Sequence, residues 1–287
     1  MEPSASPLGG EIRRARKLIP LVGVGVKRSV SAMGRERLEI EFGRHAGWVV
    51  EAIESLGLDA MPAACRGTGD PNLFALLADA MKARRGTLVL DVGCGIGGPG
   101  SWLATERGCE VVGIDVMEES VRGSRRLFPQ LRTVVATSRS LPFRNETFDA
   151  TWAVGVIETI THKSEALKEL SRVLVPEGRL AAYTFVSAAT KVDDAPIADR
   201  FKPLDSLIED FERGGFRILT AEASWLARPP AAWRKTQATA RAHANRLHRS
   251  DSAYEAVDRE LNKISRLCSS GEIEAWMIVG VKGSAPK

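Results

Sequence analysis

The stretch LDVGCGIGGPG, residues 90–100, decides how this chain of 287 residues folds. An apolar strand pattern runs into it and a helical pattern follows it, so it connects a strand to a helix. Gly93 and Gly95 let the backbone turn tightly and approach a ligand closely, because neither carries a Cβ atom. The helix that follows has free backbone N–H groups at its first turn. We interpret the stretch as a loop that binds a nucleotide-like ligand.

Short apolar strands alternate with helical patterns along the chain after residue 86. The predicted strands are TLVLDVG, CEVVGID, RTVVA, DATWAVGV, GRLAAYTFV, FRILTAEASWL and EIEAWMIVGVK. Strands that alternate with helices pair in parallel through right-handed crossovers. The pattern therefore predicts an α/β fold with a doubly wound, seven-stranded, mostly parallel Rossmann-like sheet.

Three segments organise the chain. Residues 1–10 are rich in Pro, Ser and Gly and are predicted to be a disordered tail. Residues 11–67 read as a helical cap, and residues 68–287 as the α/β domain with a helical lid insertion at about 227–271. The domain opens with the clearest helix signal of the chain. Asp70 is the predicted N-cap, Pro71 stands at the first helical position, and Gly86 is the predicted stop.

The composition indicates a globular protein, with 44% apolar and 26% charged residues. The apolar run at residues 18–26 is much shorter than the roughly 20 residues of a membrane helix. The four cysteines form no C-x-x-C pair, which excludes the usual zinc and disulfide patterns. A net charge of +4 is low for a polyanion binder. We therefore expect a cytoplasmic protein without a membrane or nucleic-acid partner.

Two aspartates near the glycine loop indicate the kind of ligand. Asp91 precedes the first glycine by two residues, where a carboxylate suits a cationic group better than a pyrophosphate. Asp115 ends the next strand, where a carboxylate can accept from both hydroxyls of a ribose. Together they fit an adenosyl ligand with a positively charged amino-acid tail. The alternative is that each aspartate only caps a helix or a turn.

The motifs resemble those of class I S-adenosylmethionine-dependent methyltransferases. They are LDVGCGIGGPG, VVGIDVMEESV, LPFRNETFDATWAVGVIE and LSRVLVPEGRL, in this order. The first is especially similar to the branch that methylates small molecules such as sterols, tocopherols, quinones and secondary metabolites. The resemblance implies transfer of a methyl group from S-adenosyl-L-methionine to carbon, oxygen or nitrogen of a small organic acceptor.

The resemblance also assigns residues to the cofactor. Those implied around its methionyl part are Asp91, Gly93, Cys94, Gly95 and Gly97. Asp115 would hold the ribose, and Met117 would pack on the adenine face. Thr137 and Ser138 stand where the family has an Asp-Ala pair at the adenine edge. Since that aspartate is missing, the hydroxyl of Thr137 and the backbone N–H of Ser138 are the expected partners.

Two candidate catalytic residues follow the fourth strand, in GVIETITH. Glu158 is predicted to act as a base or to orient the acceptor, unless it faces solvent at the strand end. His162 has an imidazole suited to taking a proton, or is an exposed histidine at a helix start. The sequence predicts no metal site. Basic residues between 228 and 249 fit either an anionic acceptor or a solvated helix face.

Other functions are less consistent with the motifs. Gly93, Gly95 and Gly98 also satisfy the G-x-G-x-x-G pattern of NAD-dependent oxidoreductases, but Asp91 and the downstream motifs disfavour that function. A catalytically inactive adenosyl-binding scaffold remains an alternative, because intact glycines argue only for binding.

Overall fold

The computed structural model describes residues 33–65, 69–188, 192, 201–224 and 229–283, with side chains described from residue 39 onward. Within these ranges no helix is long and apolar enough to cross a membrane. The predicted tail at residues 1–10 lies outside the described residues.

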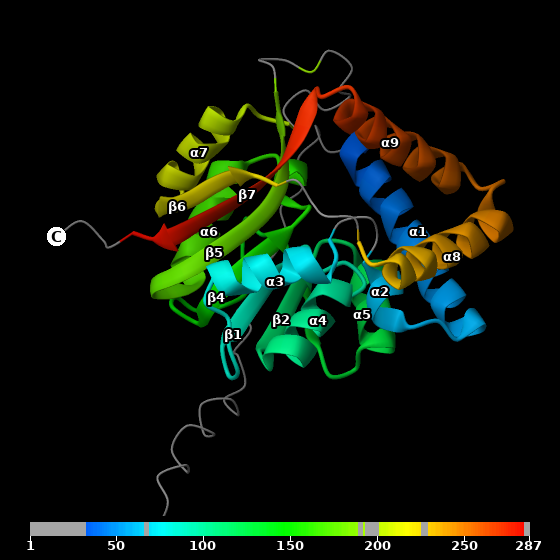
Figure 1. Cartoon of the computed structure of the whole chain (residues 1–287), viewed down its shortest axis with the longest axis horizontal. Coiled ribbons are helices and arrows are strands. Elements are labelled where there is room, and N and C mark those ends of the chain that lie inside the picture. The colour runs from blue at the N-terminus through cyan, green and yellow to red at the C-terminus, as the bar shows by residue number, and fades with distance from the viewer. Residues whose placement is uncertain (1–32, 66–68, 189–191, 193–200, 225–228, 284–287) are drawn as a thin grey trace, which may run out of the picture.

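A seven-stranded sheet forms the centre of the molecule (Figure 1). Its strands are β1 (Leu88–Val92), β2 (Glu110–Asp115), β3 (Arg132–Val135), β4 (Phe148–Val154), β5 (Leu174–Ser187), β6 (Phe216–Ala223) and β7 (Ile273–Lys282). They lie in the order β3-β2-β1-β4-β5-β7-β6. The first five are parallel, and β7 pairs antiparallel with both β5 and β6. The predicted fold class is confirmed.

Two apolar layers cover the two faces of this sheet. Leu73 and Leu77 of α3 (Pro71–Ala80) and Leu103 of α4 (Gly98–Arg107) belong to one layer. Leu170 of α6 (Lys163–Val173) and Phe211 of α7 (Leu204–Arg213) belong to the other. The helix α5 (Glu118–Leu127) packs beside β2 and β3. Buried strands of a parallel sheet require such cover on both faces.

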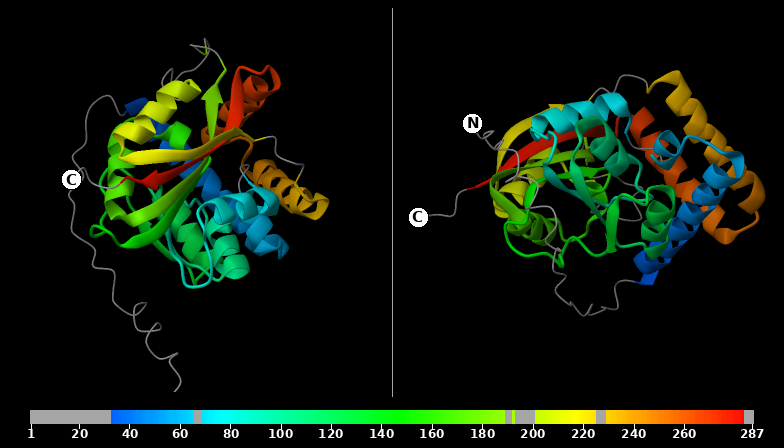
Figure 2. Two further views of the ribbon diagram at one scale, coloured as in Figure 1. Left: turned by 60° about the vertical axis from the view of Figure 1, so that its left-hand side comes forward. Right: turned by 90° about the horizontal axis from the view of Figure 1, so that it is seen from below.

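Four further helices gather at one side of the sheet (Figures 1 and 2). They are α1 (Met33–Leu56), α2 (Ala60–Ala64), α8 (Ala231–His248) and α9 (Ser252–Ser269). The N-terminal segment and the late insertion thus meet in space. Arg44 forms an ion pair with Asp251, and the rings of Trp48 and His248 stack with centroids 4.3 Å apart. We call these four helices the helical cap; the predicted domain limits stay a prediction.

The start of α3 agrees with the sequence, but its end does not. Asp70 is the N-cap, and its Oδ1 accepts from the Asn72 N–H at 2.9 Å. The helix ends at Ala80, not at Gly86. Lys82 adopts the left-handed backbone (φ 57°) usual for glycine, and the Ala83 N–H bonds back to the Ala78 carbonyl at 2.8 Å. This is a Schellman ending without glycine, which the sequence does not signal.

An aromatic cluster joins the sheet to the helical cap. The ring of Phe74 in α3 lies 5.5 Å from Trp102 of α4, 5.7 Å from Trp152 of β4 and 6.3 Å from Trp233 of α8, measured between centroids. Phe74 and Trp152 are fully buried. These aromatic contacts therefore hold the cap on the sheet. Each aromatic pair stabilises the fold beyond the effect of the apolar area that it buries.

Candidate functional site

The glycine loop turns the chain from β1 into α4. Gly93, Gly95 and Gly97 have φ angles of 68°, 53° and 92°, all in the left-handed region that other residues rarely adopt. A Cβ atom on Gly93 would lie 2.5 Å from Cγ2 of Val156, just beyond β4. The loop therefore lies where β1 and β4 diverge, which is the usual ligand site of a doubly wound sheet.

Asp115 holds this loop in place. The side chain is buried at the end of β2, where Oδ2 accepts from the Gly95 N–H and Oδ1 from the Met117 N–H, each at 2.9 Å. Met117 is half-buried, and its Cβ lies close to Gly43 of α1: a Cβ added at Gly43 would be 3.8 Å from it. The cap thus covers the predicted adenine side.

Asp91 is a buried carboxylate with an incomplete set of partners. Its Oδ2 makes no hydrogen bond of normal geometry with any described residue, and a Cβ on Gly100 would lie 2.7 Å from it. Burial raises the pKa of Asp91 to about 7; the nearby Trp152 indole opposes the rise, and the charge of Asp115 adds to it. A cationic ligand would supply the partner that this carboxylate lacks.

Asp70 is a second such carboxylate, and the sequence indicated it only as a helix cap. Its Oδ1 caps α3, while Oδ2 is buried and makes no hydrogen bond within the described part of the chain. Burial raises the pKa of the Cys65 thiol well above its usual value, and the charges of Asp91 and Asp70 add to this. The two carboxylates therefore act on one buried region. The packing of α2 and α3 against α4 brings this region together, and no local sequence pattern signals it.

Thr137 and Ser138, the predicted partners of the adenine edge, follow Ala136, whose backbone pairs with that of Asp115. They follow the end of β3, and both are half-buried. The Ala136 N–H donates to the Asp115 carbonyl at 3.0 Å. The turn is closed by a hydrogen bond from the Ser140 N–H to the Thr137 carbonyl at 3.1 Å. The structure thus brings the predicted ribose and adenine residues to one edge of the sheet.

The two candidate catalytic residues have different surroundings. Glu158 is buried in a short 3-10 helix (Ile157–Thr159), where its Oε2 accepts from the Thr184 hydroxyl at 2.8 Å. The buried Lys163 amine donates to the carbonyl oxygens of Ile160 at 2.7 Å and Glu158 at 3.4 Å, which fixes this turn. His162 is exposed and makes no capping hydrogen bond from its side chain at the start of α6.

Tyr183 is a residue near Glu158 that the predicted site did not include. It lies on β5, next to Thr184, in the apolar layer that also contains α3 and part of the cap. Burial raises the pKa of Tyr183, and the charges of Cys268, Glu158 and Asp70 add to the shift. In the sequence, Tyr183 is signalled only by the alternation of side chains between the two faces of the strand. No group of acidic, His or Cys residues suited to a metal ion occurs among the described residues.

Comparison with known proteins agrees with this geometry. Residues 90–182 match the family model described as a methyltransferase domain. Methyltransferase GfsG of Streptomyces halstedii is 33% identical over 129 residues, 42% of this chain and 46% of that protein. Malonyl-[acyl-carrier protein] O-methyltransferase of Enterobacter lignolyticus (strain SCF1) is 32% identical over 157 residues, 51% of this chain and 61% of that protein. The chain thus spans about a third to three fifths of the length of such relatives.

Solved structures share the fold over a larger part of the chain. The crystal structure of the [4+2]-cyclase SpnF matches with a TM-score of 0.65 at 22% identity and covers 85% of this chain and 96% of that one. The cyclopropane synthase MmaA2 from Mycobacterium tuberculosis matches with a TM-score of 0.60 at 17% identity, covering 74% and 83%. Residues 90–182 thus match a methyltransferase domain, in the part of the chain where the motifs predict one.

The contact between Gly93 and Val156 gives a test of the loop geometry. We expect Gly93→Ala to lower the free energy of unfolding by about 2–4 kcal/mol, from backbone strain plus overlap with the valine. Gly86→Ala, also at positive φ but with open space around it, should lose only about 1–2 kcal/mol. Urea denaturation measures both.

A double-mutant cycle separates overlap from strain. Val156→Ala removes the nearest atom, Cγ2 at 2.5 Å, and leaves the Cβ at 2.9 Å, so it should restore part of the loss, about 1 kcal/mol, in the Gly93→Ala background. Strictly additive effects would contradict the close approach.

Proposed function

We propose that this protein transfers a methyl group from S-adenosyl-L-methionine to a small organic acceptor. One observation carries the proposal. A loop of three left-handed glycines, held by Asp115, adjoins a buried Asp91, whose Oδ2 makes no hydrogen bond of normal geometry with any residue that the structure describes. This combination suits an adenosyl ligand with an ammonium group, and it disfavours the pyrophosphate of NAD, which would add negative charge beside Asp91.

The residues divide the work as follows in this proposal. Asp115 accepts from the ribose hydroxyls, and Met117 packs on the adenine face. Thr137 and the backbone N–H of Ser138 bind the adenine edge. Asp91 faces the methionyl part together with Gly93, Cys94, Gly95 and Gly97. When bound, the cofactor supplies a methyl group on a sulfonium, together with its own leaving group.

The chain itself must then orient the acceptor, exclude water and remove a proton where the acceptor has one to lose. Glu158 is the stronger candidate base, because it is buried and its carboxylate is oriented by Thr184. His162 is the second candidate. Because its side chain is exposed, it could take a proton only from an acceptor that extends to the protein surface near the start of α6. Four free cysteines support a reducing, cytoplasmic location.

Isothermal titration tests the cofactor. We expect S-adenosylmethionine and S-adenosylhomocysteine to bind at micromolar concentration and NAD not to bind. Asp115→Ala should weaken adenosyl binding at least about 100-fold, because it removes both the ribose acceptor and the support of the loop. Asp79→Asn, an exposed aspartate at the end of α3, is the matched control and should leave binding unchanged. Binding of NAD alone would instead indicate an oxidoreductase.

The raised pKa of Asp91 predicts a pH dependence of cofactor binding. An ammonium group binds the ionised carboxylate, so affinity should rise about tenfold between pH 5.5 and 7, with proton release at the lower pH. An α-amino group keeps its proton over this range. The free protein should lose stability as pH rises from about 4 to 7, because the unfolded chain ionises first.

Asp91→Asn is the control for this titration. The amide does not ionise, so both the binding and the stability should lose this part of their pH dependence. A slope that persists unchanged in the variant would assign it to another group.

Single-turnover methyl transfer tests the two candidate bases, with an acceptor identified by screening small molecules against radiolabelled cofactor. Glu158→Gln keeps the shape and the bond from Thr184 but cannot take a proton, so the rate should fall about 100-fold or more with cofactor affinity unchanged. His162→Gln should change the rate of methyl transfer less than about threefold. The reverse pattern would make His162 the base. Cofactor binding without turnover on any acceptor would favour the adenosyl-binding scaffold.

A further inference from the structure

Asp70 and Trp233 each bury a polar atom that makes no hydrogen bond with any residue that the structure describes. In Asp70, at the start of α3, this atom is Oδ2, and in Trp233, in the first turn of α8, it is the indole N–H. Asp70 is fully buried, and Trp233 is 9% exposed. A buried polar atom costs free energy unless a partner satisfies it, so each of these atoms indicates a missing partner.

The ring of Phe74 contacts both the start of α3 and the start of α8. Phe74 lies one turn after Asp70, and its backbone N–H donates to the Asp70 carbonyl at 2.9 Å. A Cβ on Gly69, next to Asp70, would lie 2.3 Å from Cε1 of this ring. The ring also lies 6.3 Å from that of Trp233, measured between centroids. The acceptor of Asp70 and the donor of Trp233 therefore belong to one neighbourhood.

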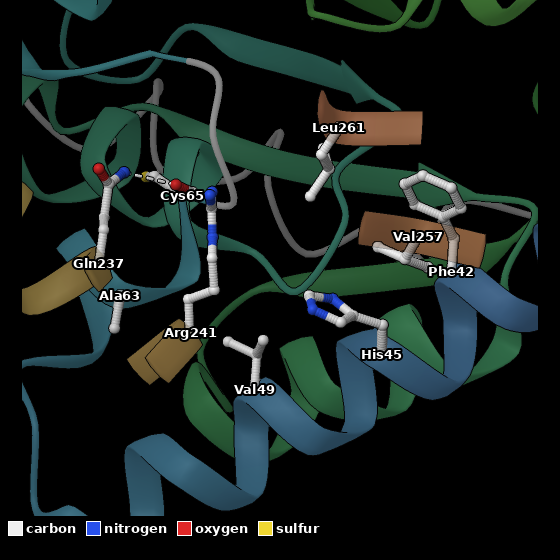
Figure 3. Close-up of a pocket in the computed structure, with 9 residues that line it drawn as sticks. All are labelled: Phe42, His45, Val49, Ala63, Cys65, Gln237, Arg241, Val257 and Leu261. Carbon is white, nitrogen blue, oxygen red and sulfur yellow. Dashed lines mark hydrogen bonds between the residues drawn. The ribbon is translucent and has the colours of Figure 1, made fainter. Parts of the chain in front are cut away.

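A second contact brings α8 to the same region. Gln237 follows Trp233 by four residues, so the two side chains lie on one face of α8. The Gln237 amide donates to the carbonyl of Cys65, on the wall of a pocket of about 60 Å³ inside the helical cap (Figure 3). Burial raises the pKa of the Cys65 thiol, and the charges of Asp91 and Asp70 add to the rise. The start of α8 thus lies beside the region proposed for the methionyl part of the cofactor.

The two unpartnered atoms are complementary to the two charged ends of an α-amino acid. A carboxylate oxygen accepts from an ammonium group, whereas an indole N–H can only donate and therefore suits a carboxylate. A zwitterion supplies a charge for each of these hydrogen bonds, and charge-assisted hydrogen bonds are about twice as strong as neutral ones. An alcohol or a water molecule supplies neither charge.

We propose that Asp70 and Trp233 bind a zwitterionic α-amino acid group, with Asp70 accepting from the ammonium and Trp233 donating to the carboxylate. The inference rests on the proposed function, because it places this group beside the methyl donor. Two ligands carry such a group: the cofactor, in its methionyl tail, and an acceptor that is itself an amino acid. In either case α8 contributes to ligand binding, although it lies outside the matched residues 90–182.

Two matched ligands test the cofactor as the source of this group. S-adenosylhomocysteine has the amino-acid tail, and 5′-methylthioadenosine is an adenosyl thioether without it. In isothermal titration, Asp70→Asn should bind S-adenosylhomocysteine at least about tenfold more weakly and 5′-methylthioadenosine within about twofold of the unmodified chain. Trp233→Phe keeps an aromatic ring but loses the N–H, so it should cost about threefold or more with the same selectivity. Asparagine is also a good N-cap, so Asp70→Asn keeps α3 capped.

L-Norleucine tests an amino-acid acceptor as the source. It is titrated by saturation-transfer NMR into the chain saturated with S-adenosylhomocysteine. If the acceptor carries the group, both variants bind S-adenosylhomocysteine normally, and each binds norleucine at least about threefold more weakly than the unmodified chain does. Either pattern supports the pair and identifies its ligand.

Asp79→Asn and Trp276→Phe are the matched controls. Asp79 is exposed at the end of α3. Trp276 has an indole N–H that likewise bonds to no described residue, but it packs in the other apolar layer. Both controls should bind every ligand as the unmodified chain does, and circular dichroism checks that each variant folds.

Unchanged binding of both amino-acid ligands in either site variant overturns the proposal, and so does an equal loss of S-adenosylhomocysteine and 5′-methylthioadenosine. If neither adenosyl ligand binds the unmodified chain, the proposed function fails, and norleucine titrated alone decides the pair. Norleucine binding that both site variants weaken then supports the pair, and no norleucine binding overturns it.

Discussion

The two hydrogen bonds of Asp115 fix the geometry on which the site depends. They tie the backbone after β1 to the backbone after β2, so two loops from neighbouring strands form one rigid edge. The glycines make this possible, because their positive φ angles allow the N–H of Gly95 to face a carboxylate. A hydrogen bond to a charged group is stronger than a neutral one, and burial keeps water from competing for it.

The helical cap packs against this edge through α1 on α5 and α2 on α4. Its helices come from opposite ends of the chain and meet through Trp48 and His248, through Arg44 and Asp251, and through the bond from Gln237 to Cys65. The aromatic cluster around Phe74 then fixes the cap on the sheet. Burial strengthens electrostatic interactions, including those of the Asp91 carboxylate.

Local pattern was enough to predict the strands, the mostly parallel sheet, the N-cap at Asp70 and the placement of Asp91 and Asp115. These features depend on periodicity and on residues a few positions apart. The early end of α3 escaped prediction because Lys82 occupies a backbone region where glycine is the usual signal. The bond from Thr184 to Glu158 and the pocket within the helical cap depend on contacts between distant segments, which one sequence does not encode in any local pattern. The same holds for the buried Asp70 oxygen, which bonds to no residue that the structure describes.

The close contact between Gly98 and Cys65 has a consequence for studies of motion. The thiol is fully covered, and its raised pKa keeps it protonated while α2 rests on α4. Alkylating reagents attack the thiolate, so Cys65 can react only when this contact opens. The exposed Cys268 reacts first and is readily removed by substitution. The rate of alkylation at Cys65 would then measure how often the contact between α2 and α4 opens, through a residue that the chain already contains.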